Sequence, residues 1–346
     1  MVSSNISGGI RRQTTNLVLN HEKLESIHYS NLRRTQIKIL PSAFAKILEE
    51  LKESVYANWN DDSCLYQGKN VIAIDGSKFN LPYSEELQKE FDINSLSNSG
   101  NCYSYTPQCL VSTFYDVYRK IPIIRDVRNV NSSERAVVFE NLEKIPDNSI
   151  IVGDRNYYGY EIFHEIVNSN QDFLIRLPVK NGFNEVKKFV KSTSRDCEIV
   201  INRTKYTKLR SGKSKEHFKP LKIRLIKYTP ENGDEEIVIA TSLLDKEKYS
   251  AESLQKLYWS RWQVELNYRD EKSYIKSAEL RSLSVNGVLQ ELYAASILIV
   301  VTNYEVYKRQ IDNNSCHKPQ LLTAVTTIAS SLPKLMSLAK FKAKKF

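Results

Sequence analysis

The order of apolar segments between residues 70 and 177 limits the possible folds of this chain more than any other feature. Three β-rich runs come first, and two more follow, each after a segment with helical spacing of apolar residues. The order is therefore β-β-β-α-β-α-β. The segments are Val71–Asp75, Cys109–Val117, Ile121–Val127, a helix opening at Ser132, Ser149–Asp154, a helix over Tyr160–Val167, and Phe173–Leu177.

This order predicts a ribonuclease H-like α/β fold, in which helices flank a mixed sheet. In that arrangement three antiparallel strands are extended by parallel strands that arrive through helices. Asp75, followed by a Gly-Ser turn, and Asp154 end the first and fourth strands. We expect the two strand ends to be neighbours in the sheet, so that the two carboxylates lie close together.

Residues 178–250 stay mainly β and interrupt what should be a strand-to-helix connection, which predicts an inserted β-rich subdomain. The stretch 203–227 within it holds ten Lys or Arg residues against one acid, Glu216. Such a run is either a solvated face or a surface that follows a phosphate backbone, and we favour DNA contact because nearly all the excess charge lies here. The candidate DNA-binding residues in the run are Lys205, Lys208, Arg210, Lys213 and Lys215.

The terminal regions carry less information. A helix that opens at Pro41 has apolar positions at helical spacing, and it either packs on the core or contacts DNA. A second helix is predicted over Val288–Tyr304, before a lysine-rich end. The expected division is a partly helical unit 1–66 that is a candidate for binding DNA ends, catalytic core 67–177, insertion 178–250, second part of the core 251–310, and basic tail 311–346.

Composition restricts the class of protein. The net charge is +10, which suggests a polyanionic partner without separating nucleic acid from an anionic membrane. The most apolar run, Ala294–Val301, is far shorter than the roughly 20 residues that span a bilayer, and we expect no membrane partner. Scattered cysteines without CxxC spacing and the lack of an amino-terminal apolar stretch favour the cytoplasm. Without ligand-spaced histidines or a Gly-rich loop, no nucleotide cofactor is expected.

A long helix is predicted from Ala251 to about Ile275. One stripe of it is apolar, and beside that stripe Tyr258, Arg261, Glu265 and Lys272 are spaced three, four and seven residues apart. These four side chains would share one face of a continuous helix. An ion pair between Arg261 and Glu265 explains part of this pattern. Together with two strand-end aspartates in a positive cleft, however, Glu265 would complete a set of carboxylates able to hold two divalent metal ions.

The pattern Tyr258-x2-Arg261-x3-Glu265-x6-Lys272 resembles the YREK signature of a large group of prokaryotic DDE insertion-sequence transposases. These proteins also carry an Asp at the end of the first strand and an Asp-Arg pair after the fourth, to which Asp75 and Asp154-Arg155 correspond. A β-rich insertion lies between their second Asp and the Glu. The resemblance covers about residues 70 to 275.

The resemblance implies that Asp75, Asp154 and Glu265 bind two Mg²⁺ ions, or Mn²⁺ in their place, for nicking and strand transfer. Tyr258, Arg261 and Lys272 would grip phosphates near a base flipped from the transposon end, and Arg155 would contact DNA or brace the triad. The expected partners are double-stranded inverted-repeat ends and target DNA, bound by a homodimer on the bacterial nucleoid.

Flipping a base requires an aromatic partner, which in this family is often a Trp of the insertion. The insertion here has no Trp, so we expect Tyr206, Phe218 or Tyr228 to stack on the flipped base. Trp259 and Trp262 are interpreted as packing residues. Two alternatives remain: an inactive remnant that only binds DNA ends, and a ribonuclease H-like nuclease with no role in transposition.

Overall fold

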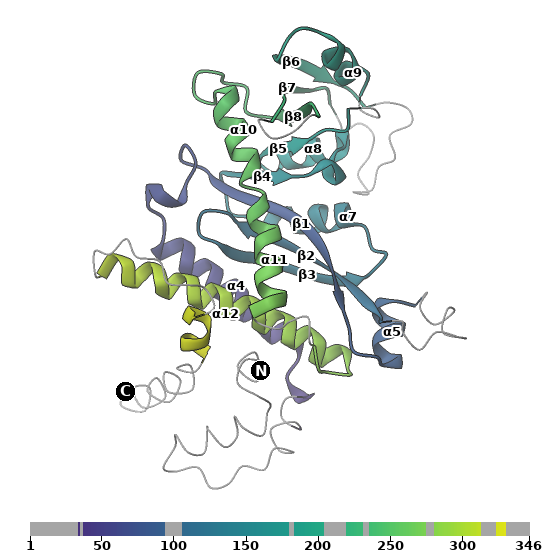
Figure 1. Ribbon diagram of the computed structural model, residues 1–346, viewed down its shortest axis with the longest axis vertical. Coiled ribbons are helices and arrows are strands. Elements are labelled where there is room, and N and C mark those ends of the chain that lie inside the picture. Colours follow the sequence, from purple (N-terminus) through teal and green to yellow (C-terminus); the bar gives the residue numbers. More distant parts are fainter. Residues whose placement is uncertain are drawn as a thin grey trace.

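The computed structural model describes residues 34, 37–93, 106–179, 183–203, 219–230, 235–274, 280–312 and 323–329. One eight-stranded sheet in the order β3-β2-β1-β4-β5-β8-β7-β6 runs through it, with helices on both faces (Figure 1). The strands are β1 Asn70–Asn80, β2 Gln108–Asp116, β3 Ile121–Asn129, β4 Ser149–Gly153, β5 Asp172–Arg176, β6 Asp196–Ile201, β7 Leu221–Tyr228 and β8 Ile237–Thr241. The helices are α4 Pro41–Asn58, α5 Glu85–Phe91, α7 Glu134–Asn141, α8 Tyr160–Asn168, α9 Asn184–Lys191, α10 Ala251–Trp259, α11 Trp262–Tyr274 and α12 Val285–Asp312, with short 3-10 turns η1 Asp62–Cys64, η2 Leu142–Lys144 and η3 Arg155–Tyr157.

The first five strands have the predicted ribonuclease H-like arrangement. Strands β1, β2 and β3 pair antiparallel, whereas β4 pairs parallel to β1, and β5 parallel to β4. The parallel strands arrive through α7 and α8, because a parallel neighbour requires a crossover connection. The mixed sheet flanked by helices is thus confirmed.

Among the described positions of residues 178–250, strands are more common than helix, and these strands extend the same sheet. Strand β8 pairs antiparallel with β5, β7 with β8, and β6 with β7. Helix α9, which the apolar pattern did not reveal, lies against β6 and β7. The inserted segment is therefore joined to the core edge to edge through the β5–β8 ladder.

Two hydrophobic clusters lie on opposite faces of the sheet. Alternate residues of β1 separate between them, with Ile72 and Ile74 in one cluster and Val71 and Ala73 in the other. The first cluster contains side chains of α4, α7, α8 and α9, and the second contains side chains of α5, α10 and α11. Both faces of the central strands are therefore buried, as expected for parallel strands that are covered by helices.

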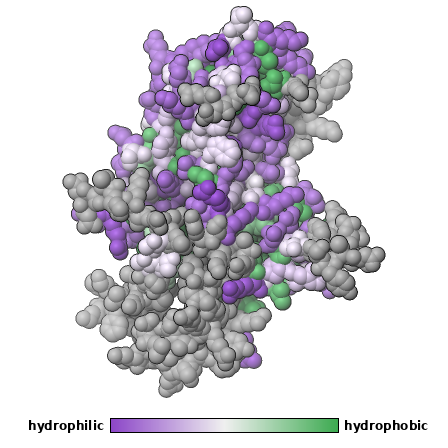
Figure 2. Space-filling model, in the orientation of Figure 1, coloured by the Kyte–Doolittle hydropathy of each residue, from purple (hydrophilic) through white to green (hydrophobic). Residues whose placement is uncertain are grey.

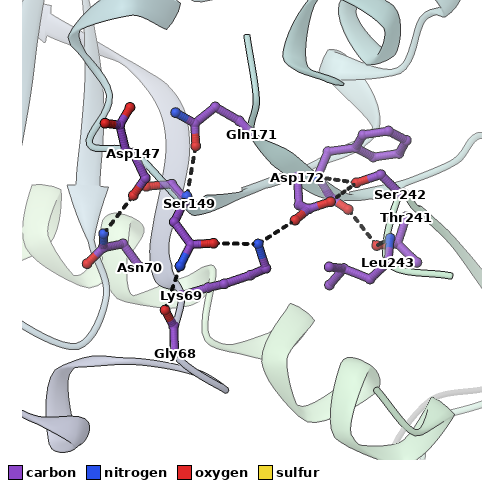
Figure 3. Close-up of polar contacts among 12 residues, drawn as sticks. Gly68, Lys69, Asn70, Asp147, Ser149, Gln171, Asp172, Thr241, Ser242 and Leu243 are labelled. Atoms are coloured by element: carbon purple, nitrogen blue, oxygen red, sulfur yellow. Dashed lines mark hydrogen bonds and ion pairs between the residues drawn. The ribbon is translucent and has the colours of Figure 1, made fainter. Parts of the chain in front are cut away.

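Polar contacts fix the amino ends of the central strands (Figure 3). Just before β1, Lys69 Nζ lies 2.6 Å from Asn148 Oδ1, next to β4, and 2.9 Å from Asp172 Oδ2 at the start of β5. Asp172 also accepts a 2.6 Å hydrogen bond from Ser242, which follows β8. One cation thus links β1, β4 and β5 at their amino ends, away from Asp75 and Asp154.

Helix α12 is long and apolar enough to cross a membrane by length and composition alone. It lies beside α4 and packs on β3, and 56% of its most apolar window is buried inside the protein (Figure 1). A mostly buried core helix has the same composition, so this is weak evidence for a membrane span. On the face in Figure 2 the described surface is mainly hydrophilic, with apolar residues in small groups.

Candidate active site

Asp75 lies within β1 and not at its end. The strand continues to Asn80, because β2 pairs with it as far as the Asn80–Gln108 position, so the predicted Gly-Ser turn after Asp75 is wrong. The parallel partner β4, however, stops pairing at Ala73. Asp75 therefore stands just past the end of the parallel ladder, where the sheet leaves a side chain accessible from the β4 side.

Asp154 follows β4 directly, on the same face as Asp75. Ala73 of β1 and Val152 of β4 belong to the cluster beneath α10 and α11, and each aspartate comes two residues later in an extended backbone. Since side chains two residues apart in extended chain point to one face, both carboxylates face the helices that include Glu265. Asp154 Oδ1 accepts a 2.8 Å hydrogen bond from the Asn156 backbone and so begins η3.

The predicted single helix around Glu265 is in fact two helices. Helix α10 ends at Trp259 and α11 begins at Trp262. At the junction the Ser260 hydroxyl bonds to the Leu257 carbonyl, and backbone N–H groups bond three residues back, as in a 3-10 turn. The four signature residues therefore do not share one stripe of a continuous helix.

The junction nevertheless brings Arg261 against Glu265. The guanidinium lies 2.7 Å from the Glu265 carboxylate, and Arg261 is only 8% exposed. The guanidinium also interacts with the buried Tyr258, and it lies over the Trp262 ring, 5.5 Å from the ring centroid. Arg261 Nε is buried and has no hydrogen-bond partner among the described residues. The ion pair expected from the spacing exists, but the exposed helix face that it presupposed does not.

Contacts between α11 and β1 set the distance between Glu265 and Asp75. The Tyr268 hydroxyl donates to the carbonyl oxygens of Asp75, at 2.8 Å, and of Val111, at 2.9 Å. Lys272 Nζ donates to Ser77 Oγ at 2.8 Å and to a neighbouring carbonyl, and burial lowers the pKa of Lys272. Lys272 therefore already has protein partners near the site.

A hollow of about 480 Å³ opens between β1 and α11, and Asp75 and Glu265 both line it, together with Ser77, Tyr268, Arg269 and Lys272. Within the described part of the chain, no three His, Cys, Asp or Glu side chains come close enough together to hold a metal ion. The donor set itself, three carboxylates, suits a hard divalent cation. The Arg261 guanidinium interacts with both Glu265 and Asp75.

The comparisons with known proteins identify the family. A sequence model described as "Transposase DDE domain" matches residues 66–301, which is more than half of the chain. The chain belongs to the transposase DDE domain family.

Two curated relatives of this DDE domain are transposases of bacterial insertion sequences. The "Probable transposase for insertion sequence element IS5377" of Geobacillus stearothermophilus is 27% identical over 164 residues, which is 46% of this chain and 41% of the relative. "Transposase InsG for insertion sequence element IS4" of Escherichia coli K12 is 22% identical over 246 residues, 70% of this chain and 53% of the relative. The matches thus span about half the length of these relatives. A solved piggyBac transposase synaptic complex with hairpin DNA aligns with 97% of this chain and 79% of that one, at a TM-score of 0.49 and 8% identity.

Other candidate residues of this DDE domain have mixed outcomes. Arg155 is exposed in η3, next to Asp154. Within the basic run, Arg224 is buried against Asp196, and Lys227 donates to carbonyl oxygens at the carboxyl end of α9, so these two cations hold β7 in place. Tyr228 is buried and cannot stack on a base. Outside the described residues lie Lys205, Lys208, Arg210, Lys213, Lys215, Tyr206 and Phe218.

The interpretation of two tryptophans as packing residues is wrong. Trp259 is 40% exposed and Trp262 is 47% exposed, on either side of the α10–α11 junction. On one continuous helix their burial could be judged from periodicity, but the break rotates both rings away from the core. The signal in the sequence that could have revealed this helix break is the polar pair Ser260 and Arg261, which lies between the two tryptophans.

Sequence reasoning also missed Glu134, at the start of α7. Its carboxylate lies against Gly76 and accepts a 2.8 Å hydrogen bond from the Tyr157 hydroxyl. Burial raises the pKa of Asp75 to about 7, with nearby Glu134, Glu265 and Asp154 adding to the rise and Arg261 opposing it. The Ser-Ser-Glu sequence predicted the start of a helix. The contact of Glu134 with β1, however, is a tertiary contact that the sequence pattern does not reveal.

The raised pKa of Asp75 predicts a pH-dependent stability. Asp75 binds its proton more tightly in the folded than in the unfolded chain, so its contribution to stability is full below about pH 4 and is lost as the pH rises through 7. In the metal-free protein, Asp75→Asn should raise the melting temperature by about 4 °C at pH 8 and by much less at pH 4. Thermal unfolding in chelator at both pH values checks this. An equal difference at the two pH values would contradict it.

Proposed function

We propose that this chain is a DNA transposase that nicks and excises its own mobile element, through hairpin ends, and joins the 3′ ends to target DNA. In this proposal it acts in the bacterial cytoplasm, on the nucleoid, as a homodimer that bridges two inverted-repeat ends. The observation that carries the proposal is that Asp75 and Asp154 lie on one face of a ribonuclease H-like sheet, opposite Glu265, within a transposase DDE domain.

The three carboxylates would bind two Mg²⁺ ions, for which Mn²⁺ could substitute. Ions held there would activate a water or a 3′ hydroxyl and stabilise the leaving oxygen during in-line attack at phosphorus. The protein's own contribution is to hold the carboxylates in place. Tyr268 clamps the Asp75 backbone to β2, Asp154 is fixed by its own cap on η3, and Arg261 holds the Glu265 carboxylate.

Side chains at the α10–α11 junction would grip the distorted transposon end. Arg261 has an unpartnered Nε in the described structure, and a phosphate oxygen is the acceptor that a guanidinium N–H prefers. Trp259 and Trp262 offer exposed indole faces beside it, and a displaced base stacks on such a face. Tyr258 would act through Arg261, because its own ring is buried. Lys272 and Arg155 would contact the backbone on the β1 and β4 sides of the hollow.

The basic run of the inserted segment would bind the duplex. Replacing Lys205, Lys208, Lys213 and Lys215 by Gln should weaken binding to any duplex and reduce the slope of log affinity against log salt concentration by about 0.9 per lost phosphate contact. Binding titrations at several salt concentrations measure the slope. Because Lys222 already pairs with Glu198, Lys222→Gln is a matched control that should change the slope much less. If the variant with all four lysines replaced had the same slope as the wild type, the basic run would be a solvated face that does not contact DNA.

The proposal is tested on a linear DNA that carries the inverted repeats flanking the gene as a facing pair. Incubation with the purified chain and Mg²⁺ should produce nicked ends, then hairpins, then products joined to a second DNA. End binding without nicking would support the alternative of an inactive, end-binding remnant. Cleavage without joining to target would instead support a nuclease with no role in transposition.

A further inference from the structure

Asp75 and Asp154 each have a glycine beside them, with Gly76 after Asp75 and Gly153 before Asp154. Because successive residues of a strand point to opposite faces, the two glycines face α7 and α8 while the aspartates face α10 and α11. Neither glycine has a positive φ. Glycine is therefore explained at these positions by the lack of room for a side chain, and not by backbone conformation.

Glu134 and Tyr157 fill that space. A Cβ atom at Gly76 would lie 2.5 Å from Cδ and 2.7 Å from Oε2 of Glu134. A Cβ atom at Gly153 would lie 3.2 Å from the Tyr157 ring. The Tyr157 hydroxyl donates a 2.8 Å hydrogen bond to the same Oε2 of Glu134. One hydrogen-bonded pair thus supports both strand segments directly behind the two aspartates.

Both members of this pair are held rigidly. Tyr157 is 2% exposed and closes the 3-10 turn that Asp154 caps. Burial and the nearby carboxylate keep the pKa of Tyr157 well above its ordinary value, so the hydroxyl stays protonated and can donate. Glu134 stands in the first turn of α7, where the helix dipole favours a carboxylate. The hydrophobic core requires neither polar group. Phe in place of Tyr157 and an apolar side chain in place of Glu134 would fill the same volume at a lower desolvation cost.

We infer that Glu134 is a positioning residue of the active site, which sets the separation of Asp75 and Asp154 through its contact with Gly76 and its hydrogen bond to Tyr157. It acts from the opposite face of the sheet and does not itself bind an ion. Groups behind the ligands of a metal site tune affinity in this way, and their loss weakens metal binding by about 10- to 100-fold. The inference rests on the proposed function, because it assigns Asp75 and Asp154 to an ion.

The test measures Mn²⁺ binding by calorimetry to the full chain without DNA. Glu134→Ala and Tyr157→Phe should each weaken binding about 10-fold, because each breaks the hydrogen bond. Glu134→Gln should stay within about 3-fold of the wild type, since its amide oxygen still accepts from the Tyr157 hydroxyl. Glu143→Ala, which removes an exposed carboxylate soon after α7, is the matched control and should bind as the wild type does.

Gly76→Ala tests the same contact without changing either partner, because the added methyl group must displace the Glu134 carboxylate. It should weaken Mn²⁺ binding to a similar extent while the circular dichroism spectrum stays that of the wild type. Wild-type affinity in Glu134→Ala, or equal weakness in Glu134→Gln and Glu134→Ala, would overturn the inference. If the wild type itself bound no Mn²⁺, the proposed function would fall too. Binding that is lost in Asp75→Asn but unchanged in Glu134→Ala would remove the inference alone.

Discussion

Replacement of Asp75, Asp154 or Glu265 by alanine should reduce nicking of transposon ends on the order of 1000-fold while leaving end binding almost unchanged. A metal-held carboxylate site contributes several kcal/mol of stabilisation to the transition state, and each 1.4 kcal/mol corresponds to about a factor of ten in rate. The basic residues that would bind the duplex are not altered by these changes. Quantifying nicked product and the retarded protein–DNA complex in parallel separates the two effects.

The matched controls are exposed carboxylates that the site does not include. Glu252→Ala on α10 and Glu143→Ala on η2 should nick at the wild-type rate. Calcium should support end binding but not nicking by the wild type, because its larger and looser coordination does not suit in-line displacement. Nicking at near wild-type rate by any one of the three alanine variants would remove that residue from the triad.

The fold could be predicted from the sequence where local patterning and burial agree. Strand β4 and its aspartate were predicted within one residue, because a continuous short apolar run bounded by turns is typical of a strand buried on both faces. The end of β1 was not, since Gly76 and Ser77 suggest a turn locally, while pairing with β2 keeps them extended. Helix α9 was missed because it has only two buried apolar residues, Val186 and Phe189.

The candidate site was predictable in composition but not in detail. Asp75 and Asp154 were singled out by their place in the order of elements, and Glu265 by its spacing from Arg261 and Lys272 and by the family resemblance. The α10–α11 break came from side-chain hydrogen bonding at Ser260, a choice between two backbone geometries of similar energy. Glu134 could not be predicted, because its contact with Gly76 joins residues 58 positions apart and leaves no periodic signal.

Arg261→Ala should impair hairpin formation and its resolution about 100-fold, and the first nick less than about 10-fold. If Arg261 existed only as half of an exposed ion pair, its loss would cost roughly 0.3–0.5 kcal/mol of stability and would leave catalysis intact. The 8% exposure of Arg261 and its unpartnered Nε argue against that alternative. A preorganised donor that meets developing or displaced charge is worth about 100- to 1000-fold in rate. The first nick does not require the flipped base, so it should be spared.

The variants are chosen to separate charge, shape and stacking at this junction. Arg261→Lys keeps the charge but loses the planar guanidinium group. Its hairpin formation should therefore be intermediate between that of Arg261→Ala and that of the wild type. Trp262→Ala should reproduce the hairpin defect of Arg261→Ala without its effect on Glu265, whereas Lys256→Ala removes an exposed cation of α10 and should change nothing. Nicked, hairpin and fully released products are measured separately for each variant. Wild-type proportions of all three products in Arg261→Ala would mean that this side chain only supports Glu265 and does not grip DNA.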